Sequence, residues 1–284
     1  MGWNGRKFSD LASLRTAYID GGAGSTLVMI HGVGLNASVW EPQMRAFAPD
    51  YRVIAYDSLG HGGSPLPRPG ATLGDYLDQL RDLMDGLALE RVTLMGHSMG
   101  ALIATRFAID HGDRVDALIA VNPVYRRPAG QLSNSRARIR ELEQRGPAAT
   151  LEDTLSRWFD GQAEFGAPPV RQVMAWMQRL DPRGYARAYR VFCEADPWLD
   201  GRLGALCVPA LFVTGELDPN SSPAMSRAMA AEAPLGRAVV LAGERHMMAY
   251  ISPDRFNPVV EDFLDRTAVS AGRRAATGQV REGV

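Results

Sequence analysis

The sequence predicts an α/β fold in which a mostly parallel central sheet carries helices on both faces and an inserted helical cap. Short apolar runs recur along the 284-residue chain, separated by segments with helical periodicity. Strands that are apolar on both faces occur in parallel sheets covered by helices on either side. The alternation stops between residues 123 and 205, where helical patterns follow one another without a convincing strand. This interruption predicts the insertion.

Apolar runs mark the expected strands of the sheet. They comprise residues 27–31, 53–56, 92–96, 117–121, 208–214 and 238–242. Between the second and third runs, apolar side chains from Tyr76 to Leu87 recur at three- and four-residue steps, as one face of a helix requires. We therefore expect a crossover helix over residues 75–89, of the kind that joins parallel strands.

The domain boundaries follow from where the strand pattern stops and resumes. We expect one core built from residues 1–122 and 206–269, with residues 123–205 as a helical cap, or lid. Such a block is expected to lie over the carboxyl edge of the sheet, where ligands of α/β folds bind. Residues 270–284 contain Gly, Arg, Ala and Glu without apolar periodicity, which predicts a flexible tail.

Composition and charge exclude several classes of protein. Hydrophobic residues make up 46% of the chain and charged residues 22%, as in ordinary globular proteins. The formal net charge of -1 argues against a nucleic-acid partner. Apolar runs long enough for a signal peptide or a membrane span are missing, so we expect a cytoplasmic protein without a membrane partner. The two cysteines lack the spacing of a disulfide framework or a zinc site.

The strongest motif is G-x-S-x-G, formed by Gly96-His97-Ser98-Met99-Gly100 between a predicted strand and a predicted helix over residues 101–111. A tight strand-to-helix turn lifts such a serine clear of the sheet, and glycines on either side avoid collisions. The start of the helix also favours developing negative charge. We expect Ser98 to be a nucleophile and the amide of Met99 to be an oxyanion donor. The alternative is a glycine-rich turn with an incidental serine.

A serine nucleophile needs a general base, and the base needs a carboxylate that orients it. His246 follows the last apolar run, in the loop before a final helical segment, and Asp218 follows the run that ends at residue 214. Glu216 and Asp196 are the competing carboxylates. Along the sequence, Ser98, Asp218 and His246 follow the order nucleophile, acid, base. This is the order found in enzymes whose nucleophile lies on a G-x-S-x-G turn.

A second oxyanion donor is expected from the loop His31-Gly32-Val33-Gly34, which follows the first apolar run. The backbone amide of Val33 is the first choice and that of Gly34 the alternative, and Gly34 is also a candidate substrate contact. The loop is not a dinucleotide fingerprint because the G-x-G-x-x-G pattern is incomplete.

On these motifs the chain resembles the capped α/β-hydrolases, a family that includes esterases, lactonases, amide-cleaving enzymes and carbon–carbon bond hydrolases. The likeness covers roughly residues 15–125 and 205–265, and Asp57 and His61 resemble residues that brace a loop in that family. The resemblance implies serine-centred acyl transfer on a small-molecule carbonyl substrate, without a cofactor or metal. Relatives that release halide or open epoxides carry aspartate at the nucleophile position, so Ser98 argues against both activities.

Substrate choice is expected to lie in the inserted cap. Arg126 and Arg127 open it and are candidates to clamp a substrate carboxylate, although adjacent arginines in a linker are usually solvated. Among the aromatic residues of the cap, Trp176 is the candidate substrate contact, and Met247 is the candidate for the pocket floor.

The fold leaves other functions open. Some relatives are cofactor-free oxygenases or acyltransferases, and a non-catalytic small-molecule receptor would keep the same fold while leaving its ligand unchanged. The oligomeric state is also open, a homo-oligomer included.

Overall fold

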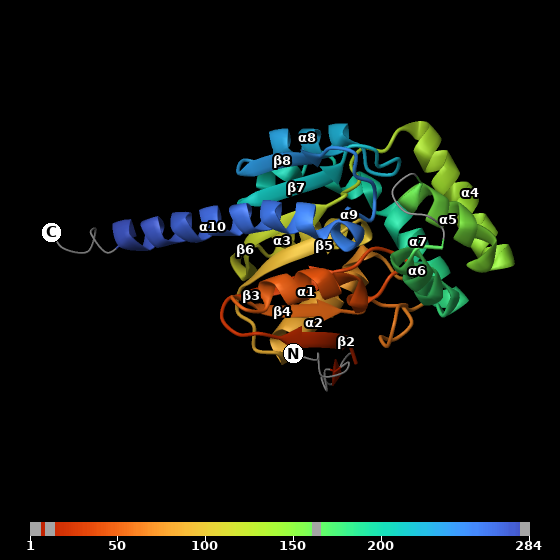
Figure 1. Ribbon diagram of the computed structural model, residues 1–284, viewed down its shortest axis with the longest axis horizontal. Helices are drawn as coiled ribbons and strands as arrows, with labels where there is room; N and C mark the ends of the chain where they lie inside the picture. Colours follow the sequence, from red (N-terminus) through yellow and green to blue (C-terminus); the bar gives the residue numbers. More distant parts are fainter. Residues whose placement is uncertain (1–6, 9–14, 161–165, 279–284) are drawn as a thin grey trace.

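A mixed, mostly parallel sheet forms the centre of the computed structural model, which describes residues 7–8, 15–160 and 166–278 (Figure 1). Within those residues the sheet has eight strands in the order β1-β2-β4-β3-β5-β6-β7-β8. The strands are β1 Lys7–Phe8, β2 Ala17–Gly21, β3 Thr26–Ile30, β4 Arg52–Tyr56, β5 Val92–His97, β6 Val115–Val121, β7 Ala210–Gly215 and β8 Gly236–Leu241. Strands β3 to β8 pair parallel with one another, which confirms the predicted fold class.

The sheet has an antiparallel edge that the apolar pattern did not predict. Strand β2 pairs antiparallel with β1 and with β4, and only its first two residues are buried. Asp20 on β2 forms an ion pair of 3.1 Å with Arg52 on β4. A partly buried strand with a charged residue and a glycine lacks the continuous apolar run by which the fully buried strands were found.

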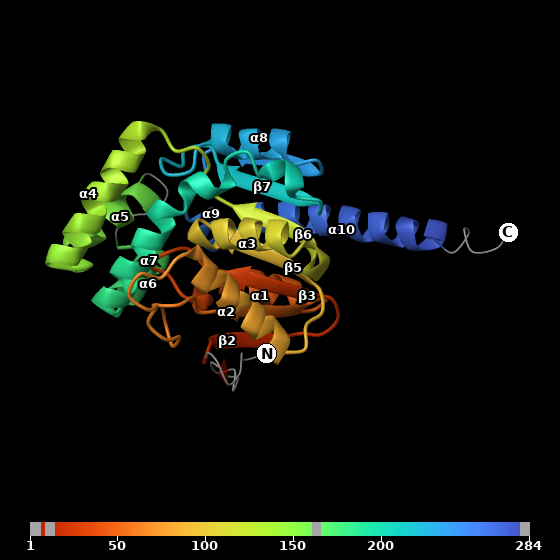
Figure 2. The same ribbon diagram turned by 180° about the vertical axis from the view of Figure 1, so that it is seen from behind.

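Helices cover both faces of the sheet (Figures 1 and 2). Helices α1 and α10 lie together on one face, whereas α2 and α3 lie together on the other. The helices outside the insertion are α1 Glu41–Phe47, α2 Leu73–Gly86, α3 Met99–Asp110, α8 Pro223–Glu232, α9 Met248–Ile251 and α10 Pro253–Gly278. Short 3-10 turns occupy Ala37–Trp40, Gly112–Arg114, Asp196–Leu199 and Leu203–Ala205. The expected crossover helix is α2, which begins at a capping box formed by Thr72 and Asp75.

Between β6 and β7 the chain forms a run of helices that we call the insertion. These helices are α4 Ala129–Arg145, α5 Ala148–Phe159, α6 Pro168–Gln178 and α7 Pro182–Glu194. They gather at one end of the sheet (Figure 1). Glycine and proline lie at two of the helix ends: Gly146 adopts a φ of 77° at the end of α4, and Pro168 begins α6, where the missing amide hydrogen costs nothing.

Residues 270–278, expected to belong to a flexible tail, are helical in the structure. Helix α10 continues to Gly278 and extends away from the sheet (Figure 1). Residues 270–278 are rich in alanine and arginine, which have high helix propensity and extend a helix without an apolar face. Residues 279–284 of the expected tail lie outside the described residues.

The turn between β5 and α3 requires glycine at two positions. A Cβ added at Gly96 would overlap the carbonyl oxygen of Gly100, and a Cβ at Gly100 would overlap the carbonyl oxygen of Ile30 on β3. These contacts are with backbone atoms, which cannot rotate away as a side chain can. The first helical turn of α3 therefore packs directly against the neighbouring strand.

We predict that Gly100→Ala lowers the free energy of unfolding by about 3 kcal/mol. The added methyl group would overlap the backbone of β3 and push α3 away from that strand. Urea denaturation measures the loss. The control is Gly112→Ala, where an added Cβ meets no atom within 4 Å and the change should stay below about 0.5 kcal/mol. Equal effects at the two sites would show that the turn tolerates a side chain.

Candidate active site

Ser98 lies on the tight turn between β5 and α3 with φ 54° and ψ -112°, a region that L residues rarely occupy. Its backbone amide donates to the carbonyl of Val121 at 2.9 Å, and its carbonyl accepts from the amides of Ala101 and Leu102. The serine is 5% exposed. These bonds hold the strained turn in place, so that the position of the side chain is set by the junction of strand and helix.

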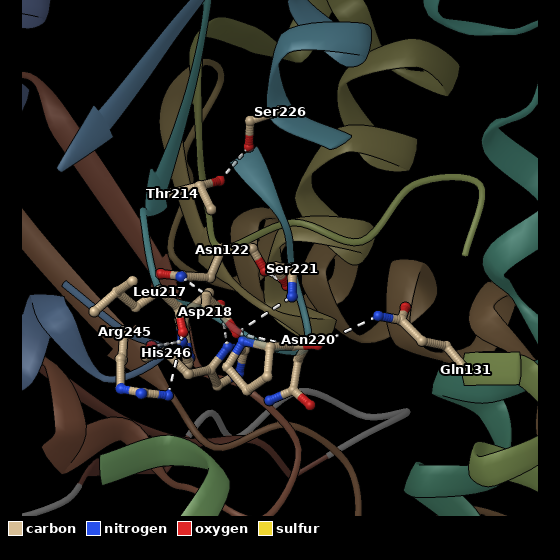
Figure 3. A network of polar contacts seen from close by, with 12 residues as sticks. Asn122, Gln131, Thr214, Leu217, Asp218, Asn220, Ser221, Ser226, Arg245 and His246 are labelled. Atoms are coloured by element: carbon tan, nitrogen blue, oxygen red, sulfur yellow. Dashed lines mark hydrogen bonds and ion pairs between the residues drawn. The ribbon is translucent and has the colours of Figure 1, made fainter. Parts of the chain in front are cut away.

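His246 and Asp218 come from the loops that follow the neighbouring strands β8 and β7. Nδ1 of His246 donates to Oδ2 of Asp218 at 2.7 Å, and both side chains are buried. Figure 3 shows the two side chains pointing toward each other. Since the proton on Nδ1 is committed to the carboxylate, Nε2 of the neutral ring carries the free lone pair. His246 and Ser98 line the same cavity.

Asp218 is held by other donors besides His246. The side-chain amide of Asn122 donates to Oδ2 at 2.6 Å, and the backbone amides of Asn220 and Ser221 donate to Oδ1 at 2.8 and 3.2 Å (Figure 3). Burial raises the pKa of Asp218, but His246 and these hydrogen bonds outweigh it and hold the pKa below its ordinary value. Asp218 is therefore a carboxylate that orients His246.

Sequence reasoning missed Asn122, which binds Asp218 from the end of the parallel strand β6. It adopts a positive φ of 47°, and its carbonyl accepts from the hydroxyl of Ser221 at 2.7 Å. Its place directly after an apolar run is the signal that marks it. Of the competing carboxylates, Glu216 instead accepts from the amide of Gly243 at 2.9 Å, and the side chain of Asp196 lies outside the described residues.

His97, the second residue of the G-x-S-x-G motif, supports the loop of His246. Its Nε2 donates to the carbonyl of His246 at 2.8 Å, and the two rings lie 4.7 Å apart. Burial, followed by the neighbouring His246, lowers the pKa of His97 to about 3, so the ring is neutral at ordinary pH. From the other side, Trp158 of α5 stacks on His246 with ring centroids 5.7 Å apart.

Hydrogen bonding in the loop after β3 distinguishes the two candidate oxyanion amides, those of Val33 and Gly34. The amide of Gly34 donates to Nε2 of His61 at 2.9 Å, and Nδ1 of that ring bonds the carbonyl of Leu59. The Gly34 amide is thus committed to the loop. Among the described residues, the amides of Val33 and of Met99, the first residue of α3, have no protein acceptor.

Asp57 and His61 hold the surrounding loops together, as the resemblance implied. The two carboxylate oxygens of Asp57 accept from the amides of Ala37 and Gly63, each at 2.8 Å. Burial, together with the nearby His31, lowers the pKa of His61 to about 3. Neutral His61 can therefore accept from Gly34 through Nε2.

A cavity of about 170 Å³ separates Ser98 and His246 from the insertion. It is comparable to a cavity of about 150 Å³ that holds benzene, so it suits a small ligand. It is lined by Val33, Ser98, Val124, Arg127, Gln131, Asn134, Ser135, Arg138, Thr154, Arg157, Trp158, Tyr185, Tyr189, Phe192, Pro219, Asn220 and His246. The insertion thus supplies most of the wall that faces the serine.

The residues expected to contact the substrate lie in different surroundings in the structure. Arg127 lines the cavity. Arg126 is half exposed and pairs with Asp200 and Glu232 away from it. The remaining candidates lie elsewhere: Trp176 packs against Tyr250, Gly34 faces Tyr185 and Met177, and Met247 lines a narrow second space behind His246. Arg126, Trp176, Gly34 and Met247 are thus not among the residues that line the cavity beside Ser98, where a substrate contact was expected.

Comparison with known proteins identifies the family. A family model described as alpha/beta hydrolase fold matches residues 25–253. The chain belongs to the alpha/beta hydrolase family. Within it, the chain is 37% identical to the (E)-2-((N-methylformamido)methylene)succinate hydrolase of Acinetobacter baylyi, over 92% of this chain and 98% of the relative. It is 28% identical to 3-oxoadipate enol-lactonase 2 of the same organism, over 84% and 88% of the two chains.

Solved structures agree with this family assignment. The crystal structure of the enol-lactonase from Burkholderia xenovorans superposes with a TM-score of 0.84 at 26% identity, covering 91% of this chain and all of that one. A thermophilic esterase from Thermogutta terrifontis with malate bound superposes with a TM-score of 0.83 at 25% identity, over 93% and 99% of the two chains. These four relatives are thus named as a hydrolase, enol-lactonases and an esterase. None of its described helices is long and apolar enough to span a membrane.

We predict that His97→Leu lowers the free energy of unfolding by about 1–3 kcal/mol, because the buried carbonyl of His246 loses its donor. Chemical denaturation of the purified variant measures the change. His97→Gln keeps a side-chain N–H near the same carbonyl and should lose less. If leucine and glutamine destabilise the chain equally, the hydrogen bond to His246 contributes nothing measurable.

Proposed function

We propose that this chain is a serine hydrolase of a small carbonyl substrate, with Ser98 as nucleophile, His246 as general base and Asp218 as the carboxylate that orients the base. The substrate bond is that of an ester, lactone or amide, or a carbon–carbon bond next to a carbonyl. The observation that carries the proposal is the buried His246–Asp218 hydrogen bond, beside the same cavity as Ser98 on its strained turn.

The proposed reaction uses the geometry in two stages. Oγ of Ser98 attacks the carbonyl carbon while Nε2 of His246 takes the hydroxyl proton, and His246 then gives that proton to the leaving group. Water, activated by the same histidine, attacks the acyl-serine and releases the acid. The amides of Val33 and Met99, which have no protein acceptor among the described residues, suit the oxyanion. One such donor contributes about 2.7–4 kcal/mol to transition-state stabilisation.

The relatives support the carbonyl chemistry of this proposal. The name of the Acinetobacter baylyi relative specifies a hydrolase of a compound with an N-methylformamido group, and other relatives are enol-lactonases. An amide and a lactone both offer an acyl carbon to a nucleophile. We also propose that the insertion acts as a cap, because its side chains form the wall of the cavity opposite Ser98.

An acyltransferase, a cofactor-free oxygenase or a receptor on this fold would use Ser98 and the ligand differently. An acyltransferase would pass the acyl group from Ser98 to an acceptor other than water, and a cofactor-free oxygenase would consume oxygen without needing the serine. A receptor would leave its ligand unchanged. The intact Asp218–His246 bond favours a reaction that needs a general base.

We predict that Ser98→Ala lowers turnover of 4-nitrophenyl acetate by about 10³- to 10⁶-fold, because the acyl-enzyme cannot form. Release of 4-nitrophenol is followed by absorbance, and circular dichroism verifies the fold. The control is Ser156→Ala, an exposed serine of α5, which should keep full activity. Undiminished turnover by Ser98→Ala would contradict the serine mechanism.

A further inference from the structure

The wall of the cavity opposite Ser98 is cationic. Arg127 from the start of the insertion, Arg138 from α4 and Arg157 from α5 all line it. Among the described residues, the cavity lining contains no aspartate or glutamate. Three guanidinium groups around one small cavity, without an acidic residue in its wall, are unusual because like charges repel one another.

Arg138 and Arg157 share a single carboxylate. Nη2 of Arg138 lies 2.8 Å from Oδ2 of Asp153, and Nη1 of Arg157 lies 3.8 Å from the same oxygen. The Asp153 side chain is 76% exposed, so water screens its charge. One solvated carboxylate therefore faces two cations, and the cluster keeps an excess positive charge toward the cavity.

The two arginines differ in how well their donors are satisfied. Arg138 is 7% exposed, and it also donates through Nη1 to the hydroxyl of Thr154 at 2.7 Å. These bonds tie α4 to α5, which gives Arg138 a structural role. Within the part of the chain that the structure describes, Arg157 has only the long contact to Asp153. Its side chain is 37% exposed, but its Nε is buried and has no hydrogen-bond partner among those residues. A buried donor without a partner is destabilising, so this N–H would gain from a ligand that accepts a hydrogen bond.

The electrostatics of Arg157 agree with this difference. Burial, followed by the positive charge of Arg138, lowers the pKa of Arg157. Both effects destabilise the charged guanidinium, and an anion placed beside Nε would offset both. The planar guanidinium, with its parallel N–H groups, matches a carboxylate in bidentate geometry.

We propose that Arg157 binds a carboxylate of the substrate, with Arg138 behind it reinforcing the positive field. The carbonyl compound cleaved by this chain is then a small carboxylate-bearing ester, lactone or amide. The assignment of the reacting carbonyl rests on the proposed function, whereas anion binding at Arg157 does not.

Binding of succinate to the full-length chain tests the anion site without any turnover. Isothermal titration calorimetry at pH 7.5 should show binding of succinate, and binding of its neutral diamide at least tenfold weaker. Arg157→Gln should weaken succinate binding tenfold or more, and Arg157→Lys should recover part of the loss. The control is Arg145→Gln on α4, an exposed arginine paired with Glu141, which should bind succinate as the unmodified chain does. Equal binding of acid and diamide, or an unchanged affinity in Arg157→Gln, would overturn the proposal.

Turnover of a matched pair of esters separates this proposal from the serine mechanism. Monomethyl succinate carries one carboxylate, whereas dimethyl succinate is neutral. We expect kcat/KM to favour the monomethyl ester at least tenfold, and Arg157→Gln to remove that preference. If Ser98→Ala abolishes turnover but the two esters react equally, the serine mechanism stands and the anion site is wrong. If succinate binding depends on Arg157 but Ser98→Ala retains turnover, the anion site stands and the serine mechanism is wrong.

Discussion

The hydrogen bond between Asp218 and His246 is the interaction on which the candidate site depends. The two residues lie 28 positions apart in the sequence and follow the parallel neighbours β7 and β8, so the sheet brings their loops together. Asn122 holds the carboxylate from the end of β6, and His97 holds the backbone of His246 from the end of β5. Residues at the carboxyl ends of neighbouring strands thus hold a single histidine in place, because parallel strands all end on the same side of the sheet.

Much of this arrangement was predictable from sequence because buried parallel strands leave a strong apolar signal. Each apolar run forms a strand, and the glycine-flanked serine lies on the turn where its motif requires it. Strand β2, which lies next to the edge strand β1, gave no such signal, since only its first two residues are buried. Asn122 and His97 were missed for another reason. Their partners lie about 100 and 150 positions away. The place of Asn122 after an apolar run marks it as a candidate, but the local sequence specifies the partner of neither residue.

The insertion shows where sequence reasoning about substrate contacts fails. Arg126 and Arg127 are adjacent, yet Arg126 pairs with the carboxylates of Asp200 and Glu232 while Arg127 lines the cavity. Arg126 adopts a positive φ of 48°, which turns the chain between the two arginines. A positive φ at an arginine is not predictable from the residue type, as it often is at a glycine. Arg157 was not a candidate at all. A charged residue on an amphipathic helix is usually solvated, and only the packing of α4 against α5 turns this one toward the serine.

The central claim is that Asp218 and His246 activate Ser98. Its most direct test is labelling by a fluorophosphonate, which reacts with activated serines, followed by peptide mass spectrometry of the folded chain. We expect stoichiometric labelling at Ser98 that is slowed by orders of magnitude in Asp218→Asn, because the imidazole then loses its orienting carboxylate. Labelling of Ser98 at the same rate in Asp218→Asn, or no labelling of the folded chain, would contradict it.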